Sequence, residues 1–154
     1  MVIATFMDFT CPYCRSLVPV LDSVLSAFPA DVAVDFHHFP LDSHEFAVPG
    51  AVAAECAHRQ GRFGHMYHVL YDQMESIGMK QWREFAADAG IPDVAAFERC
   101  IQLPVDSFLR IGAGRALGES IGVVGTPTIW VNGRQHSGRS VEAFRARADK
   151  LGIP

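Results

Sequence analysis

The residues of this sequence most suited to chemistry are a pair of cysteines, Cys11 and Cys14, in the stretch FTCPYC. Two thiols at this spacing can exchange disulfides, form a local staple, or supply half of a zinc site. The two cysteines are so near in sequence that a disulfide between them would close only a very short loop, which disfavours a purely stabilising role. A zinc site needs a second close pair, whereas Cys56 and Cys100 stand far apart. The spacing therefore favours a redox dithiol.

The predicted strand before the cysteines and the predicted helix that begins at them would make Cys11 a reactive thiol. Residues 2–9, VIATFMDF, predict a buried strand, and apolar residues recur at helical spacing from Leu17 to Phe28. Cys11 then lies near a helix N-cap, and Cys14 lies inside the first turn, where free backbone N–H groups favour a thiolate. A thiol so placed has a lowered pKa and is a nucleophile, and the more buried Cys14 would resolve the mixed disulfide.

The rest of the chain predicts a mixed α/β domain. VAVDFHHF, residues 32–39, predicts a second strand, and residues 46–101 predict several short helices. Residues 105–121 predict one more helix. TIWV, from Thr128, followed by Asn132-Gly133, predicts a hairpin with its return strand at 135–137. Ser140 is expected to cap a last helix.

Two segments carry a family resemblance. FMDFTCPYC with Pro19 after it, and VVGTPTIWVNG at residues 123–133, resemble the two halves of the thioredoxin-superfamily signature. HHFPL, AAECA and QGRF are similar to the DsbA-like branch. The resemblance covers nearly the whole chain. It implies an α/β thioredoxin fold, a central mixed β-sheet flanked by helices, with an inserted all-helical subdomain. The expected single domain spans 1–154, with its core at 1–44 and 105–154 and the insertion at about 45–104.

The same resemblance implies a thiol-disulfide oxidoreductase. Cys11 would be the nucleophile and Cys14 the resolving thiol, so the dithiol is the redox group and neither a cofactor nor a metal is expected. Thr126-Pro127 matches the cis-proline loop that faces the active cysteines in the superfamily. A cis bond there would let the backbone of Thr126 pair with an extended substrate peptide.

The sequence departs from the family pattern in ways that bear on the dithiol. Many thioredoxin-like proteins have a buried acid six residues before the first cysteine, where this chain has Thr5. Pro12 and Tyr13 separate the cysteines, as in many glutaredoxins, so no imidazole stabilises the Cys11 thiolate from there. The couple is therefore expected to be less oxidising than the strongest members. Asp8 is either a residue that tunes the dithiol or a solvated strand-end residue.

The other cysteines and histidines leave alternatives open. Cys56 and Cys100 are either two buried free thiols or a structural disulfide that joins two helices and implies an oxidising compartment. His58, His65 and His68 fall on helices of the insertion, where solvent-exposed histidines are favoured over a metal site. The helix faces nearest the dithiol are expected to be apolar, to receive unfolded substrate chains.

Composition limits the partners. The formal net charge is -4 without a run of like charges, which disfavours nucleic acid, and no apolar stretch reaches the roughly 20 residues of a membrane span. The expected partners are protein thiol and disulfide substrates and a membrane oxidase or reductase that resets the dithiol, with the chain itself a monomer. Met1 runs into VIATF without a leader, so the chain is cytoplasmic, or periplasmic or extracytoplasmic if a leader was removed.

The favoured function is a DsbA-type oxidant of protein substrates. The alternative within the same chemistry is a disulfide reductase or a glutathione-dependent enzyme. Two alternatives come from another class: a non-catalytic peptide-binding module, or a thioredoxin-like domain of a larger protein such as a membrane transporter. A metal-binding module, which would retain zinc, is the remaining alternative.

Overall fold

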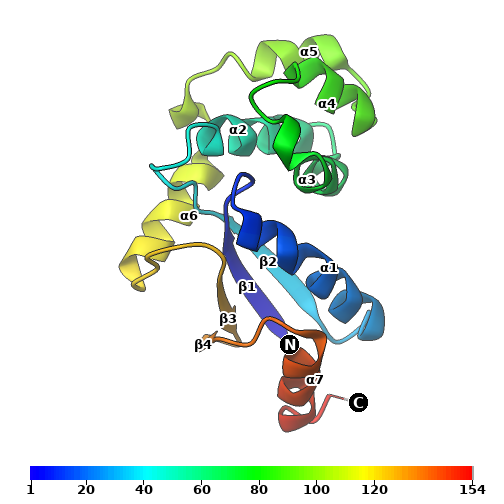
Figure 1. The fold of residues 1–154 in the computed structure, drawn as a ribbon, viewed down its shortest axis with the longest axis vertical. Helices are drawn as coiled ribbons and strands as arrows, with labels where there is room; N and C mark the ends of the chain where they lie inside the picture. Colours follow the sequence, from blue (N-terminus) through cyan, green and yellow to red (C-terminus); the bar gives the residue numbers. More distant parts are fainter. Residues whose placement is uncertain (154) are drawn as a thin grey trace.

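A computed structural model describes residues 1–153 of the chain (Figure 1). The elements of this part are, in chain order, β1 (Val2–Met7), α1 (Pro12–Ala27), β2 (Ala33–His38), α2 (Ala47–His58), α3 (Phe63–Asp72), a 3-10 turn η1 (Met74–Ser76), α4 (Trp82–Asp88), α5 (Val94–Cys100), a 3-10 turn η2 (Val105–Ser107), α6 (Leu109–Ser120), β3 (Thr128–Val131), β4 (Arg134–His136) and α7 (Val141–Lys150). No helix within residues 1–153 combines the length and apolarity needed to cross a membrane.

In this part of the chain the strands form one four-stranded mixed sheet in the order β2-β1-β3-β4. β1 runs parallel to β2, with Met7 opposite His38, and antiparallel to β3. β1 is therefore an inner strand, which explains its nearly continuous apolar sequence. Asn132 and Gly133, with φ of 47° and 75°, form the tight turn between β3 and β4. The hairpin predicted at Asn132-Gly133 is confirmed.

Side chains of β1 alternate between two cores, one on each face of the sheet. Ile3 and Met7 join the larger core with Leu17 of α1 and Phe144 of α7. Phe6 joins a smaller cluster on the opposite face, which also contains Phe39, Val123 and Trp130. Figure 1 shows α1 and α6 on either side of the strands. The sheet is thus covered on both faces, as in other α/β folds with a parallel strand pair.

Helices α2, α3, α4 and α5 lie together beyond the end of β1 that leads into α1 (Figure 1). Their apolar side chains, including Met66, Phe85 and Phe97, belong to the same core cluster as the sheet residues. Trp82 packs on the Phe85 ring, with ring centroids 5.4 Å apart. Because one core runs through both parts, the helical block is an inserted layer of the fold rather than a separately packed unit.

The prediction of one helix over residues 105–121 is wrong. The chain forms η2, breaks at Phe108 with φ -116° and ψ 80°, and begins α6 at Leu109. Phe108 is only 3% exposed, and Arg59 of the α2 C-cap lies over its ring at 4.8 Å. Burying this ring takes its backbone out of the helical conformation. Burial therefore overrides the local helical spacing.

Candidate active site

Cys11 and Cys14 lie where the chain passes from β1 into α1. Cys11 is the N-cap of α1 and Cys14 lies in its first turn, as the sequence predicts. The N–H of Arg15 donates to the carbonyl of Cys11 at 3.1 Å and closes that turn. Pro12 occupies the first helical position, where its missing N–H costs no hydrogen bond. The two sulfurs therefore share one end of the helix, with both cysteines free and buried.

Cys11 is strongly acidic for a thiol. Its pKa is lowered from 9.0 to about 5, first by a hydrogen bond from the Cys14 side chain and then by contact with Thr126 and the backbone N–H groups of Tyr13 and Cys14, against a burial effect in the opposite direction. These N–H groups are unpaired donors at a helix N-terminus, where a negative charge is stabilised. Cys11 is therefore a thiolate at neutral pH and a nucleophile.

Cys14 has the opposite character. Burial, followed by the neighbouring Cys11, raises the pKa of the Cys14 thiol above its ordinary value. The backbone N–H of Asp8 donates to Cys14 Sγ at 3.5 Å and partly offsets this effect. Cys14 is 0% exposed, so an external disulfide reaches Cys11 first. The two thiols differ in protonation and in access, which fits a division into attacking and resolving thiols.

The loop before β3 lies against the nucleophile. The Thr126–Pro127 peptide bond is cis, and Cys11 Sγ lies 3.4 Å from the carbonyl oxygen of Thr126, to which its protonated thiol form donates across 115 residues of sequence. The side chain of Thr128 donates back to the carbonyl of Gly125 at 2.7 Å and closes the loop. The structure thus brings together the two sequence segments that carry the family resemblance.

Two large exposed side chains lie close in sequence to the residues that meet here. Tyr13, between the cysteines, is 68% exposed, and Val124, two residues before Thr126, is 97% exposed. Val124 was not singled out by sequence reasoning, because a valine in a VVG segment has no pattern that marks it as exposed. Exposed apolar groups beside a reactive thiol are suited to contact with a substrate chain.

Asp8 is buried, so its interpretation as a solvated strand-end residue is wrong. Its side chain is 0% exposed and accepts hydrogen bonds from Thr10, from the Leu41 N–H and from the His44 ring. Tyr71 of α3 also donates to the carbonyl oxygen of Asp8 at 3.2 Å. Sequence reasoning missed Leu41, His44 and Tyr71, because these partners lie 33 to 63 residues away from Asp8.

Thr5 occupies the position of the family's buried acid. It is 0% exposed, lies on β1 between Phe36 and Ile129 in the sheet register, and its hydroxyl has no hydrogen-bond partner within residues 1–153. A hydroxyl with an ordinary, very high pKa does not accept a proton from Cys14. This position therefore offers the dithiol no carboxylate base.

A buried ionic group joins the sheet to the helical block and was also missed. His38 Nε2 lies 2.8 Å from Glu55 Oε1 of α2, and Arg110 of α6 lies 3.7 Å from the same oxygen. Burial lowers the pKa of His38 and keeps its ring neutral. Burial alone would raise the pKa of Glu55, but the hydrogen bond to His38 and the charge of Arg110 lower it. The carboxylate stays ionised between two elements that flank the site.

Cys56 of α2 and Cys100 of α5 form a disulfide, with Cα atoms 5.8 Å apart. Of the two alternatives for these cysteines, the structure has the disulfide. It joins α2, the first helix of the inserted block, to α5, the last of its four α-helices. His58, His65 and His68 are exposed, and no three His, Cys, Asp or Glu side chains of residues 1–153 form a group that could hold a metal ion.

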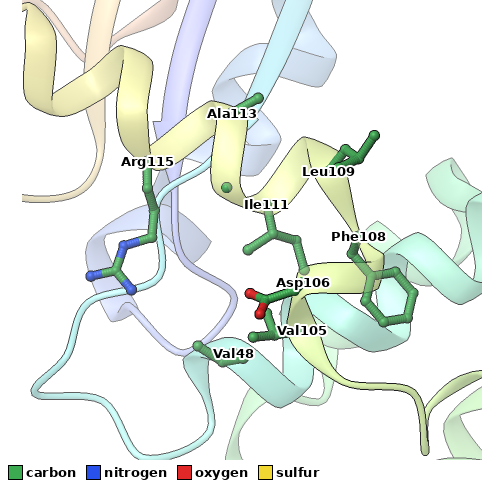
Figure 2. A pocket seen from close by; sticks show the side chains of 9 residues that line it. Val48, Val105, Asp106, Phe108, Leu109, Ile111, Ala113 and Arg115 are labelled. Atoms are coloured by element: carbon green, nitrogen blue, oxygen red, sulfur yellow. The ribbon is translucent and has the colours of Figure 1, made fainter.

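A cavity of about 440 Å³ lies beside α6 (Figure 2). Val48 from the start of α2, Phe108 and Ile111 are among its apolar lining residues, and the guanidinium of Arg115 lies at its rim. Arg115 is also paired with Asp42 at 2.8 Å. Neither cysteine of the dithiol lines this cavity.

Comparison with known proteins agrees with this geometry. A family model described as thioredoxin matches residues 1–150. BdbD from Bacillus subtilis superposes with a TM-score of 0.82 at 15% identity, covering 97% of this chain and 85% of that one. Oxidoreductase DsbA from Xylella fastidiosa superposes with a TM-score of 0.74 at 23% identity, covering 97% and 83%. At these identities the superpositions establish the fold.

The curated relatives have a different name. The chain is 30% identical over 154 residues to a protein named Na(+)/H(+) antiporter NhaA 1 from Mycolicibacterium vanbaalenii. The match covers 99% of this chain but 25% of that protein. The chain therefore spans about a quarter of the length of the curated relatives it matches.

Proposed function

Because this chain belongs to the thioredoxin superfamily and has the fold of its DsbA-like members, we propose that it exchanges disulfides with protein substrates through Cys11 and Cys14. The observation that carries the proposal is the Cys11 sulfur itself. It has a pKa of about 5 and lies at a helix N-terminus, 3.4 Å from the carbonyl oxygen of the Thr126 loop.

The exchange balances in two steps. In the reducing direction the Cys11 thiolate attacks one sulfur of a substrate disulfide, and the other substrate sulfur leaves as a thiolate. Cys14 then loses its proton and attacks Cys11 Sγ, which releases the second substrate thiolate and leaves the Cys11–Cys14 disulfide. The substrate gains two electrons and the dithiol loses two. The oxidising direction is the same sequence reversed.

The thiolate favours the oxidising direction. A lowered pKa at Cys11 stabilises the reduced protein, so the disulfide form gives up its bond to a substrate dithiol more readily. The protein would then act as a DsbA-type oxidant and need a partner that reoxidises it. A Cys56–Cys100 disulfide is also typical of proteins that work in an oxidising compartment.

Substrate binding follows from the loop at Thr126. An extended peptide next to Cys11 would pair with the backbone of Thr126 in the manner of an added strand. Tyr13 and Val124, both exposed, would contact its apolar side chains. Such contacts do not require a particular substrate sequence, so they suit an enzyme that acts on many unfolded chains.

The antiporter name of the curated relatives favours a second candidate. In this second candidate, the chain is a thioredoxin-like domain of a larger membrane transporter. Its dithiol then acts on that transporter, or the domain only binds peptide. A binding module would keep its affinity for peptides after Cys11→Ser, whereas an exchange enzyme would lose turnover.

The deciding experiment is the equilibrium redox potential of the Cys11–Cys14 pair against glutathione buffers, with insulin-disulfide cleavage measured alongside. The Cys56→Ser/Cys100→Ser variant is the control that isolates the dithiol. We expect a potential less negative than about -200 mV, because the reduced state is stabilised. A value near the thioredoxin value of about -270 mV would indicate a reductase. Unchanged insulin cleavage by Cys11→Ser would contradict the proposed exchange.

A further inference from the structure

Asp8 is the point at which the dithiol turn is connected to the rest of the fold. Its carbonyl oxygen accepts from the Cys11 N–H at 3.2 Å, and its own N–H donates to Cys14 Sγ at 3.5 Å. One residue therefore contacts the backbone of the nucleophile and the sulfur of the resolving thiol.

Both oxygens of the carboxylate are occupied. Asp8 Oδ1 accepts from the N–H and the hydroxyl of Thr10, each at 2.7 Å. Asp8 Oδ2 accepts from the Leu41 N–H at 3.0 Å and lies 2.9 Å from His44 Nδ1. A buried carboxylate is stable only when donors surround it in this way. These donors come from the dithiol turn and from the segment between β2 and α2.

A third segment reaches the same residue. Tyr71 of α3, which is 1% exposed, donates its hydroxyl to the Asp8 carbonyl oxygen at 3.2 Å. Asp8 thus connects the dithiol turn, the segment after β2 and the helical block. Its carboxylate oxygens face Thr10, Leu41 and His44, while its N–H faces Cys14, so the carboxylate is not placed as the base that deprotonates Cys14.

We propose that Asp8 is a positioning residue of the dithiol, whose carboxylate fixes the Thr10–Cys11 turn so that Cys14 and the helix N–H groups stay on the Cys11 sulfur. The inference rests on the proposed function and names a residue that this function requires. Of the contacts that lower the pKa of Cys11, those from the Cys14 side chain and from the backbone N–H groups of Tyr13 and Cys14 come from residues that directly follow this turn.

A positioning role and a charge effect predict opposite changes in the pKa of Cys11 when Asp8 is substituted, and this makes the proposal testable. A negative carboxylate near a thiolate repels it, so removing the charge alone would lower the pKa of Cys11. Loosening the turn would instead weaken the contacts that stabilise the thiolate and raise this pKa. Asp8→Asn keeps the shape but places an amide N–H₂ where an oxygen accepted two hydrogen bonds.

The experiment is the ultraviolet titration of the Cys11 thiolate in the full chain with the Cys56–Cys100 disulfide intact. We expect Asp8→Asn to raise the midpoint by about one pH unit, a tenfold loss of thiolate at a fixed pH below the midpoint. Asp35→Asn is the matched control, since it also removes a carboxylate that lies 3.0 Å from a histidine, on the exposed side of β2. Its titration should match that of the wild type.

Thr10→Ala provides a second test that leaves the Asp8 charge in place. Thr10 is half-buried, so the variant is expected to fold even if Asp8→Asn does not. Positioning predicts a rise of the midpoint that is smaller than for Asp8→Asn, and a pure charge effect predicts none. A lowered midpoint in Asp8→Asn, or an unchanged midpoint in Thr10→Ala, would overturn the proposal. A wild-type chain without an acidic thiolate or insulin cleavage would instead refute the proposed function.

Discussion

At the scale of single residues, the two cysteines obtain opposite properties from positions three residues apart. Cys11 is the N-cap residue of α1, where the backbone N–H groups of the first turn lower the pKa of its sulfur, while Cys14 is fully buried. The same hydrogen bond between the two side chains lowers the pKa of Cys11 and raises that of Cys14. One proton is thus held on the fully buried Cys14 sulfur, and the Cys11 sulfur carries the charge.

The His38–Glu55 pair makes folding stability depend on pH. Burial lowers the pKa of His38, and the contacts to His38 and Arg110 lower that of Glu55 despite burial. In both cases the unfolded chain binds more protons, so stability is present above the unfolded pKa and is lost as pH falls. We expect the free energy of unfolding to fall below pH 6.5, the ordinary value of His38, and again below 4.5, the ordinary value of Glu55.

Urea denaturation at a series of pH values checks this expectation. His38→Gln should flatten the upper part of the curve, because it removes the group that the unfolded chain protonates there. His65→Gln, a change at an exposed histidine, is the matched control and should leave the curve as in the wild type. An equally steep loss of stability in His38→Gln would assign the pH dependence to other groups.

At the scale of elements, α6 approaches the sheet through glycines. A Cβ atom on Gly114 would collide with the carbonyl oxygen of His38, and one on Gly118 would lie 2.6 Å from the Phe39 ring. Gly112, on the exposed side of the same helix, has no atom within 4 Å of such a Cβ. The small residues therefore set how closely α6 packs on the sheet.

Gly114→Ala is expected to destabilise the fold by about 2 kcal/mol, because backbone rather than a flexible side chain must move. Gly112→Ala, the matched control, is expected to stabilise it by about 0.5 kcal/mol through helix propensity. The midpoints of urea denaturation at neutral pH measure both changes. Equal midpoints in the two variants would show that α6 can shift without cost.

The elements show what sequence alone can predict here. The strand at β1, the N-cap at Cys11, the hairpin turn and the Ser140 cap follow from local rules of propensity and capping. The break at Phe108 does not, because it depends on burial of one ring against Arg59. The Asp8 contacts also could not be predicted, since Leu41, His44 and Tyr71 reach it only after the chain has folded.

At the scale of the whole molecule, the Cys56–Cys100 disulfide closes a loop with a sequence separation of 44 residues within the helical block. Chain-entropy arguments give such a cross-link about 4 kcal/mol of stabilisation. We expect the Cys56→Ser/Cys100→Ser variant to unfold at a lower temperature while it keeps the titration of Cys11, because the disulfide joins α2 to α5 and does not touch the dithiol turn.

Calorimetry and the thiolate titration, performed on the same two samples, measure these outcomes. The wild type treated with a reductant strong enough to open the disulfide should unfold like the serine variant, which separates loss of the cross-link from effects of the substitutions. An unchanged unfolding temperature in both would mean that the helical block is held by its apolar core alone.

The placement of the aromatic rings gives the molecule two built-in optical probes. The sequence has two tryptophans. Trp82 packs on Phe85 within the helical layer, and Trp130 lies on β3, a few residues beyond the Pro127 loop. Fluorescence from Trp82→Phe and Trp130→Phe proteins would therefore report the sheet and the inserted layer separately. The fluorescence of Trp130 would follow the sheet face that it shares with Phe6, and that of Trp82 would follow the helical block.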